Sequence, residues 1–312
     1  MNSYPRLYVG PMSKNIVDCI CLLDNAPVGM IPSRRQVGTN GGYVNNWNTS
    51  DFASYVKTKN NNVIIQRDHG GPLQGSEADD GLDSLINDVQ SGLDLIHIDP
   101  WKAYSDLDDG IKDTVRLIRA CHQVNPNSKY EISTEQAIRE FSTPELREIF
   151  GRVQDGLGEI YQNVVYGVVQ GGTSIRGNKN TGVFNERKFI EMVKVCKEFG
   201  LLSKEHNGDY LSSAGIKMRF DMGLDALNIA PEFGFIETKT ILDEIINEQE
   251  EDLFERLFKL CYESKKWVKW LNKDFSLTEF NKHVIIRVCC HYVFSDTNFL
   301  KIKKCLPNID DK

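Results

Sequence analysis

The chain has 312 residues, of which 40% are hydrophobic and 26% are charged, with a net charge of −7 and a pI near 5.5. This length can bury one large core, and the acidic balance argues against nucleic-acid and acidic-membrane partners, which recruit basic stripes. The eight cysteines lack metal-ligand spacing, and neither a signal core nor an apolar run of roughly 20 residues is present, so we expect a soluble, cytoplasmic protein.

Short apolar segments alternate with amphipathic helical segments through the first 247 residues. The segments predicted as strands are 7–9, 27–31, 63–65, 93–98, 130–132, 164–169, one that opens at 201–202, and 225–229. Each precedes a stretch with helical spacing of apolar residues. Eight such units are typical of an α/β protein with a (β/α)8 TIM barrel, because an open doubly wound sheet more often has about five or six strands.

Several helix starts carry their own signals. Ser13 is placed to cap the first helix, and the second helix begins at 49–51. Acidic residues at 79–80 suit the helix after the third strand. The segment 142–145, Ser-Thr-Pro-Glu, predicts a capping box with proline in the first turn. Later helices are predicted over 185–199, from about Ser213, and over 236–246.

The strand–helix rhythm ends at residue 247. Residues 248–312 begin with an acidic run and continue with leucines and aromatic residues at helical spacing. We therefore divide the chain into a barrel, 1–247, and a C-terminal helical extension, 248–312. The extension either packs on the outer helices of the barrel or forms a subunit interface rich in aromatic residues.

Polar side chains stand where the predicted strands end. Arg67-Asp68-His69 follows the third apolar segment and precedes a Gly-Gly-Pro turn. The pattern recurs in the segments 97–99, 131–135, 170–173 and 205–209, and at Asn228. Barrel enzymes keep their chemistry at the carboxyl ends of the strands, so this pattern predicts an enzyme.

Six of these segments resemble, in the same order, the accessory (non-catalytic) subunit of class II tagatose-bisphosphate aldolase. The resemblance spans nearly the whole chain, although this chain is markedly shorter, and its segments are 67–72, 96–99, 130–135, 168–170, 205–210 and 227–231. It implies a barrel of the class II aldolase superfamily. In that superfamily a divalent metal polarises the carbonyl of a ketose phosphate.

The resemblance also implies roles for individual residues. Asp68 occupies the place of the aspartate that handles the aldehyde oxygen, and Glu135 that of the proton-transfer base. His69 and His206, at two strand ends that can converge, are the predicted ligands of a divalent metal, with zinc expected. The chain departs from the catalytic enzymes at strand six, where Gln170, a poor zinc ligand, replaces a third metal-binding histidine.

The remaining polar residues of strands four and five admit two interpretations. Strand alternation points His97 and Asp99 to the same side, so they either form a hydrogen bond inside the barrel or belong to the site. Glu131 shares a face with Glu135 but lies lower in its strand. We therefore assign Glu131 to the barrel interior.

Phosphate recognition is predicted in the loop after strand six. Gly171, Gly172 and Thr173 offer backbone N–H groups and a hydroxyl to an anion. Asn228 matches an asparagine that class II aldolases place near the ketose. The other predicted substrate- or phosphate-binding residues are Arg34, Arg67, Lys102, Gln170 and Asp209, although Arg34 and Arg35 can instead form surface ion pairs.

These observations predict a lyase, a metal-dependent class II-type aldolase acting on a phosphorylated ketose. Two alternatives remain open: a non-catalytic barrel that binds and stabilises an aldolase subunit, and a sugar-phosphate epimerase or isomerase that uses the same groups for proton abstraction. The expected partners are a phosphorylated sugar and either a second copy of the chain or an aldolase subunit. Nucleic acid and membrane are not expected.

Overall fold

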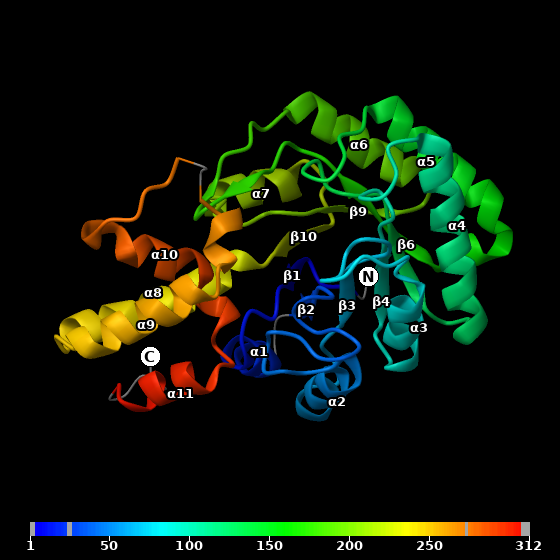
Figure 1. The fold of residues 1–312 in the computed structure, drawn as a ribbon. Helices are drawn as coiled ribbons and strands as arrows, with labels where there is room; N and C mark the ends of the chain where they lie inside the picture. The colour runs from blue at the N-terminus through cyan, green and yellow to red at the C-terminus, as the bar shows by residue number, and fades with distance from the viewer. Residues whose placement is uncertain (1–3, 24–26, 272–273, 307–312) are drawn as a thin grey trace.

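A computed structural model describes residues 4–23, 27–271 and 274–306 of the chain. Eight parallel strands form a nearly closed barrel ringed by helices (Figure 1), which confirms the predicted (β/α)8 fold. Single bridges join Met30 to Ile65 and Ser33 to Asp68 between the two ends of the sheet. In sheet order the strands are β2 (Val28–Met30), β1 (Leu7–Val9), β10 (Ala226–Ile229), β9 (Leu202–Glu205), β6 (Val164–Val169), β5 (Lys129–Ile132), β4 (Leu95–Ile98) and β3 (Gln66–Gly70).

The helices that follow the strands begin close to the predicted positions. They are α1 (Lys14–Cys21), α2 (Thr49–Lys59), α3 (Leu82–Gln90), α4 (Leu107–Val124), α5 (Thr143–Leu157), α6 (Glu186–Glu198), α7 (Ser213–Asp221) and α8 (Pro231–Asn247). Ser13 caps α1 through the N–H of Ile16, and Ser142 forms the predicted capping box with Glu145. A small hairpin, β7 (Ile175–Arg176) and β8 (Lys179–Asn180), lies outside the barrel sheet and was not predicted.

Two strands differ from their predicted ranges because they carry buried polar side chains. β3 covers Gln66–Gly70 rather than 63–65, and β9 continues through Lys204 and Glu205, both buried. Apolar content therefore placed the third strand too early, whereas β9 begins where it was predicted to open. Both strands carry their polar residues up to the carboxyl end of the barrel.

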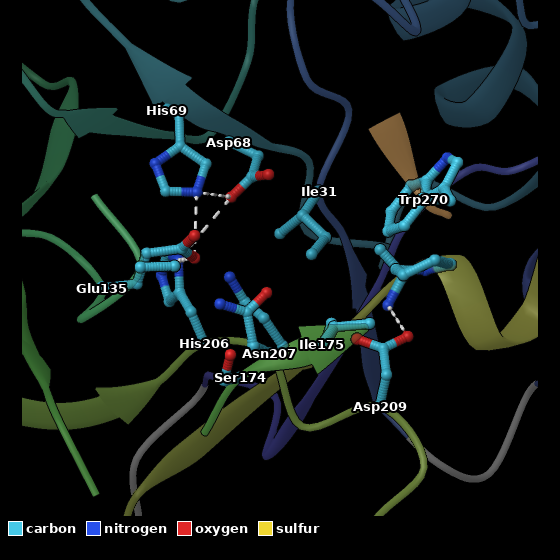
Figure 2. Close-up of a pocket in the computed structure, with 14 residues that line it drawn as sticks. Ile31, Asp68, His69, Glu135, Ser174, Ile175, His206, Asn207, Asp209 and Trp270 are labelled. Carbon is cyan, nitrogen blue, oxygen red and sulfur yellow. Dashed lines mark hydrogen bonds and ion pairs between the residues drawn. The ribbon is translucent and has the colours of Figure 1, made fainter. Parts of the chain in front are cut away.

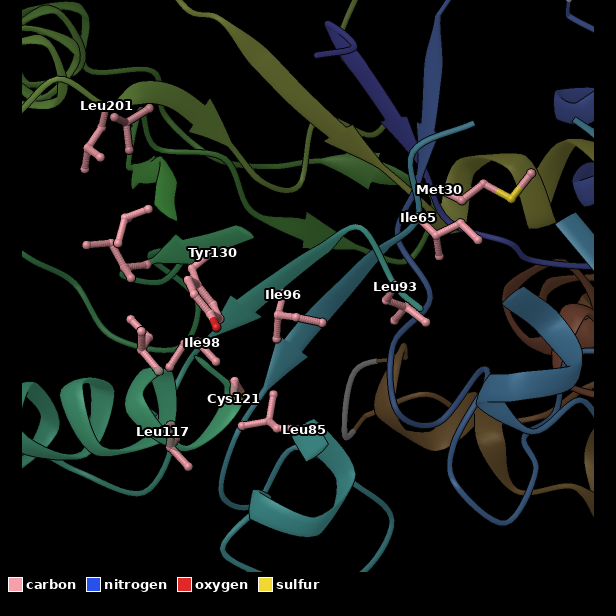
Figure 3. Packing of buried hydrophobic residues seen from close by; sticks show 14 of the residues in the cluster. Met30, Ile65, Leu85, Leu93, Ile96, Ile98, Leu117, Cys121, Tyr130 and Leu201 are labelled. Carbon is pink, nitrogen blue, oxygen red and sulfur yellow. The ribbon is translucent and has the colours of Figure 1, made fainter. Parts of the chain in front are cut away.

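The main hydrophobic core fills the space between the sheet and the helices. Figure 3 shows Leu85 of α3 and Leu117 of α4 facing Ile96 and Ile98 of β4. All four side chains are fully buried. This packing holds the strand ends at fixed positions relative to the helices outside them.

Arg67 is part of the fold rather than of a ligand site. Its guanidinium is fully buried and donates to both carboxylate oxygens of Asp88 in α3, at 2.5 and 2.7 Å. It also donates to the carbonyls of Pro32 and Val37, each at 2.8 Å. Arg67 is thus not positioned to bind a substrate, which corrects the prediction, because these protein acceptors already engage its donors.

The extension consists of α9 (Glu251–Glu263), α10 (Lys282–Cys289), α11 (Thr297–Lys304) and short 3-10 turns at 266–269, 279–281 and 290–292. Residues 272–273 and 307–312 of the predicted range lie outside the described residues. A second hydrophobic cluster joins the extension to Ile241 and Ile245 of α8. In the described ranges the chain forms no helix with the length and apolar character required to cross a bilayer.

Replacing Asp88 with alanine tests the structural role of Arg67. The variant leaves a fully buried guanidinium without its carboxylate, so we expect a loss of roughly 3–5 kcal/mol in the free energy of unfolding. Urea denaturation measures this loss. Arg147→Ala, which removes an exposed ion pair with Glu198, is the matched control and should change stability little. Equal effects of the two variants would contradict the assignment.

Candidate functional site

A cavity of about 300 Å³ opens at the carboxyl end of the barrel strands. Figure 2 shows Asp68, His69, Glu135 and His206 gathered on one side of it, with Asp209 and Trp270 across from them. Asn228 of β10 also lines the wall. Six of the predicted site residues therefore converge: Asp68, His69, Glu135, His206, Asp209 and Asn228.

Three histidines lie close together at this cavity. The ring centroids of His69, His97 and His206 are 5.0 to 5.1 Å apart in every pair. They come from β3, β4 and the end of β9, and His69 adopts a left-handed backbone conformation with φ of 48°. Such a conformation is costly for a residue with a side chain and is typical of functional sites.

Each of the three imidazoles has one ring nitrogen engaged by an oxygen. His69 Nδ1 lies 2.6 Å from Asp99 Oδ2, and His206 Nε2 lies 2.7 Å from Glu131 Oε1. His97 Nε2 lies 2.9 Å from the carbonyl oxygen of Ser133. These contacts orient the rings, and they are the kind of supporting hydrogen bond that metal-binding histidines make in proteins.

The structure resolves the two interpretations of strand four. His97 and Asp99 do not bond to each other, because Asp99 binds His69 and also accepts from Gln74 and Thr134. His97 instead belongs to the histidine cluster. Burial lowers the pKa of His97, and the neighbouring His69 and His206 add to that shift, so its imidazole is held neutral.

Two carboxylates flank the cluster at the cavity. Glu135 Oε2 is 3.4 Å from His69 Nε2 and 3.6 Å from His206 Nδ1, and Asp68 Oδ1 is 3.7 Å from His69 Nε2. Burial disfavours the charge of Glu135, but His69 and His206 hold its pKa well below the ordinary value. Asp68 Oδ1 is buried and has no hydrogen-bond partner. Glu135 is therefore ionised at neutral pH, and Asp68 presents a free acceptor.

Glu131 forms the floor of the cluster, inside the barrel as predicted. Its Oε2 accepts from Gln66 at 2.9 Å and lies 3.1 Å from the Lys204 ammonium. Burial opposes its ionisation, but Lys204, His97 and His206 hold the pKa of Glu131 well below normal. Burial also disfavours charge on His206, yet the bond to Glu131 raises the His206 pKa to about 9.

Asp68, His69, His97 and His206 can together hold a metal ion. One ligand atom from each lies within 4.8 Å of the other three. Three nitrogen donors and one oxygen donor are a set that zinc and related divalent metals accept. The donors fit such an ion because one nitrogen of each ring is already anchored and Asp68 Oδ1 has no hydrogen-bond partner among the described residues. His97 Nδ1 also accepts from the N–H of His69 at 3.3 Å, a bond that it would exchange for the ion. Two of the four, His69 and His206, are the predicted ligands.

Several predicted substrate-binding residues lie outside the cavity lining. Gln170 uses its amide to fasten the loop after β5, donating to the carbonyls of Thr134 and Arg139 and accepting from the N–H of Phe141. Arg34 pairs with Asp79, and Lys102 donates to the carbonyl of Leu73. The structure therefore does not place these three side chains at the reactive centre.

The glycine-rich loop after β6 has donors that the protein itself engages. The N–H of Gly171 donates to Glu205 Oε1 at 3.1 Å, and the Thr173 hydroxyl donates to the carbonyl of His206 at 2.9 Å. Gly172 has a φ of 98°, which glycine tolerates. The contacts of Gly171 and Thr173 anchor this loop to the end of β9. The predicted phosphate site in the loop stays a prediction.

Asp209 plays a part that its position in the sequence did not reveal. Its Oδ1 accepts from the N–H groups of Ala230 and Glu232 at the start of α8, at 2.9 and 2.8 Å. Burial raises the pKa of Asp209 to about 7. The N-terminal end of α8 thus has an internal acceptor, although Asp209 also borders the cavity.

Sequence reasoning missed Trp270 as a lining residue. Trp270 belongs to the extension, and the only sign of it was an aromatic residue at helical spacing. The extension contacts the barrel loops, where the N–H of Asn45 donates to Ser295 Oγ at 2.6 Å and that hydroxyl donates to the carbonyl of Tyr43, and Trp270 lines the cavity together with barrel residues. Helical periodicity cannot reveal such long-range docking.

Comparisons with known proteins find the same fold in solved structures. No protein-family profile and no curated protein sequence matches the chain. A probable tagatose 6-phosphate kinase from Sinorhizobium meliloti 1021 is 16% identical, with a TM-score of 0.81 over 98% of this chain and 87% of that one.

Two further structures with related folds are an aldolase and an epimerase. The YdjI aldolase of Escherichia coli K12 is 14% identical, with a TM-score of 0.58 over 96% of this chain and 91% of its own. The fructuronate-tagaturonate epimerase UxaE of Cohnella laeviribosi is 9% identical, with a TM-score of 0.62 over 96% and 75%. These similarities establish the TIM barrel fold.

Metal titration of single variants tests the histidine cluster. We expect one divalent ion per chain in the native protein and a loss of tight binding in His69→Ala, His97→Ala and His206→Ala. Glu131→Gln should weaken binding by roughly 10- to 100-fold, because it changes the acceptor that orients His206. Plasma emission spectrometry and calorimetry measure stoichiometry and affinity.

His283→Ala, which changes a histidine of α10, is the control and should bind metal normally. Full metal binding by His97→Ala would remove His97 from the ligand set. Full binding by all three variants of the cluster would exclude the metal site.

Proposed function

We propose that this chain is a metal-dependent lyase that cleaves or forms a carbon–carbon bond in a phosphorylated ketose, in the manner of class II aldolases. The observation that supports this function best is the set of three oriented imidazoles flanked by Asp68 and Glu135 at the barrel mouth. Aldol chemistry needs an electrophile for the developing oxyanion and positioned acid and base groups.

The cluster supplies these functions through its three imidazoles and its two flanking carboxylates. A divalent ion held by Asp68, His69, His97 and His206 would polarise the ketose carbonyl and stabilise the negative charge that develops on its oxygen. Glu135, ionised and bordering the cavity, is the proposed base for the proton beside the carbonyl. Asp68 also faces the cavity. It is the proposed group that accepts the proton of the substrate's hydroxyl group when the carbon–carbon bond is cleaved.

Asn228 is the proposed contact for the substrate's polar groups. Both its amide nitrogen and its amide oxygen are buried without a hydrogen-bond partner, and the residue lines the cavity. Buried amides are ordinarily satisfied, so two unpartnered atoms indicate a ligand that completes them. A sugar hydroxyl can donate to the oxygen and accept from the nitrogen.

The same site argues against a purely structural barrel. A non-catalytic subunit would keep a buried cluster of ionisable groups at a cost in stability without using it. Gln170 stands at strand six, where the catalytic class II aldolases have a third metal-binding histidine. Here His97 of β4 offers the third imidazole instead. These observations favour a catalytic chain.

An epimerase remains the second candidate, and the position of the acids bears on it. A two-base epimerase places its acid and base on opposite faces of the substrate. Here Asp68 and Glu135 both lie within 4 Å of the same nitrogen, His69 Nε2. This arrangement favours bond cleavage over proton exchange across two faces.

Glu135→Gln tests the proposed base. The variant keeps the size of the side chain, so metal content should be preserved, while the rate of aldol cleavage should fall by roughly 100- to 10,000-fold. A coupled assay for the released aldehyde, run over ketose mono- and bisphosphates, measures the rate. An unchanged rate would exclude Glu135 as the base. Formation of an epimer without aldehyde, followed by NMR, would support the epimerase instead.

Asn228→Ala tests the proposed substrate contact separately from the fold. Its amide makes no hydrogen bond with any residue that the structure describes, so the variant should keep the native melting temperature. The KM for the ketose phosphate should rise roughly tenfold or more, the effect of losing one or two hydrogen bonds. A large loss of stability with unchanged KM would show that Asn228 has a structural role.

A further inference from the structure

A second cavity, of about 600 Å³, lies beside the barrel mouth and is strongly basic. Its lining includes five cationic side chains, which come from the loop after β2 and from the extension: Arg34, Arg35, Lys265, Lys266 and Lys269. The whole chain has a net charge of −7, so this pocket is a positively charged site on an acidic protein. We refer to it below as the basic pocket.

Most of these cations lack a counterion in the protein. Arg34 pairs with Asp79, but within the described ranges no carboxylate lies at ion-pair distance from Arg35, Lys265, Lys266 or Lys269. Arg35 donates to the backbone carbonyl of Gly75 at 3.3 Å. Like charges brought together without acids repel one another, and a bound anion would relieve that repulsion.

Lys269 shows the effect of this crowding. Its ammonium lies 4.5 Å from the ring centre of Trp270 and 4.9 Å from that of Tyr292. Desolvation lowers the pKa of Lys269 to about 8, and repulsion from Arg35 and Lys266 contributes. The two rings thus hold the ammonium beside the other cations of the pocket.

The lining also lets an anion approach the backbone. Gly41, Gly42 and Gly75 border the basic pocket, and Ser76 adds a hydroxyl. A Cβ atom at Gly75 would lie 3.1 Å from the Arg34 guanidinium, so a side chain at this position would crowd that cation. Arginine, lysine and serine side chains beside open backbone are the groups that phosphate oxygens prefer.

The basic pocket adjoins the cavity lined by Asp68, His69 and Glu135, which we call the catalytic cavity because of its proposed function. Lys269 lines the former and the next residue, Trp270, lines the latter. Arg34 donates to the carbonyl of Gly71, two residues after His69. No lysine or arginine among the described residues lines the catalytic cavity itself, so its wall offers no strong countercharge for a phosphate dianion.

We propose that the basic pocket binds the phosphate group of a phosphorylated ligand, with Arg35, Lys266 and Lys269 as its principal cations. The assignment of that ligand as the sugar substrate rests on the proposed function, whereas the anion site itself does not. The phosphate belongs either to the substrate, whose sugar then reaches the catalytic cavity, or to a separate phosphorylated effector.

Calorimetric titration with inorganic phosphate tests the site without requiring turnover. The native chain should bind phosphate, and the double variant K266Q/K269Q should bind it roughly tenfold more weakly or not at all. The control K112Q/K259Q removes two exposed lysines from α4 and α9 and should bind phosphate as the native chain does. Melting temperatures verify that each variant is folded.

Three results would overturn the proposal. They are absence of phosphate binding in the native chain, equal affinity in native chain and K266Q/K269Q, and equal weakening in K112Q/K259Q, which would indicate a general effect of charge. Because none involves catalysis, a chain that lacks aldolase activity but binds phosphate here would contradict the proposed function alone.

Titration with fructose 6-phosphate distinguishes the two sources of the phosphate. If the phosphate belongs to a substrate that spans both cavities, K266Q/K269Q and Asn228→Ala should each weaken binding of this sugar phosphate. If it belongs to a separate effector, only K266Q/K269Q should do so. Unphosphorylated fructose is the reference, and its binding should not respond to K266Q/K269Q in either case.

Discussion

The buried carboxylate of Glu131 is the group on which the arrangement of the site depends. It lies inside the barrel and receives His206, Lys204 and Gln66, from the carboxyl end of β9, from β9 and from β3. An ionised group in such a place is stable only when neighbours satisfy its charge and its lone pairs. The register of β3, β5 and β9 therefore depends on the carboxylate of Glu131. Any shift between these strands would leave the charge of Glu131 or Lys204 uncompensated.

The chemistry at the mouth follows from this arrangement. Glu131 orients His206, as Asp99 orients His69 and the Ser133 carbonyl orients His97, so the three rings face one another in a defined way. At the lower level Lys204 compensates the charge of Glu131. At the upper level burial disfavours charge on His69, but in the metal-free chain Asp68 and Glu135 raise the His69 pKa well above its ordinary value. Asp68, His69 and His97 lie on β3 and β4, whereas His206 directly follows β9 and Glu135 lies just beyond β5, so the strand ends limit the movement of all five side chains.

The sequence predicted the architecture well because periodicity reports which face of an element is buried. It located eight strand–helix units and the caps at Ser13 and Ser142, since those signals are local. It failed where burial is polar: the strand predicted at 63–65 ends before β3 (Gln66–Gly70) begins. Periodicity places His97 and Asp99 on one side but cannot name their partners, and Arg67 looked like a ligand-binding cation because only the fold supplies Asp88. Trp270 depends on contacts far apart in the chain.

The carboxylate of Asp209, which caps the start of α8, affects the orientation of any ligand that binds at the barrel mouth. Parallel barrels commonly receive a phosphate at a free helix N-terminus, but here Asp209 already accepts the N–H groups of Ala230 and Glu232. An incoming phosphate would meet an oxygen acceptor instead of open donors. If the proposed ligand is a sugar phosphate, its two ends would not be equivalent to this site: the carboxylate at the start of α8 disfavours the anionic end, whereas the basic pocket beside β2 and the extension favours it. This difference between the two walls would determine which carbon atom of the proposed sugar lies next to the histidines.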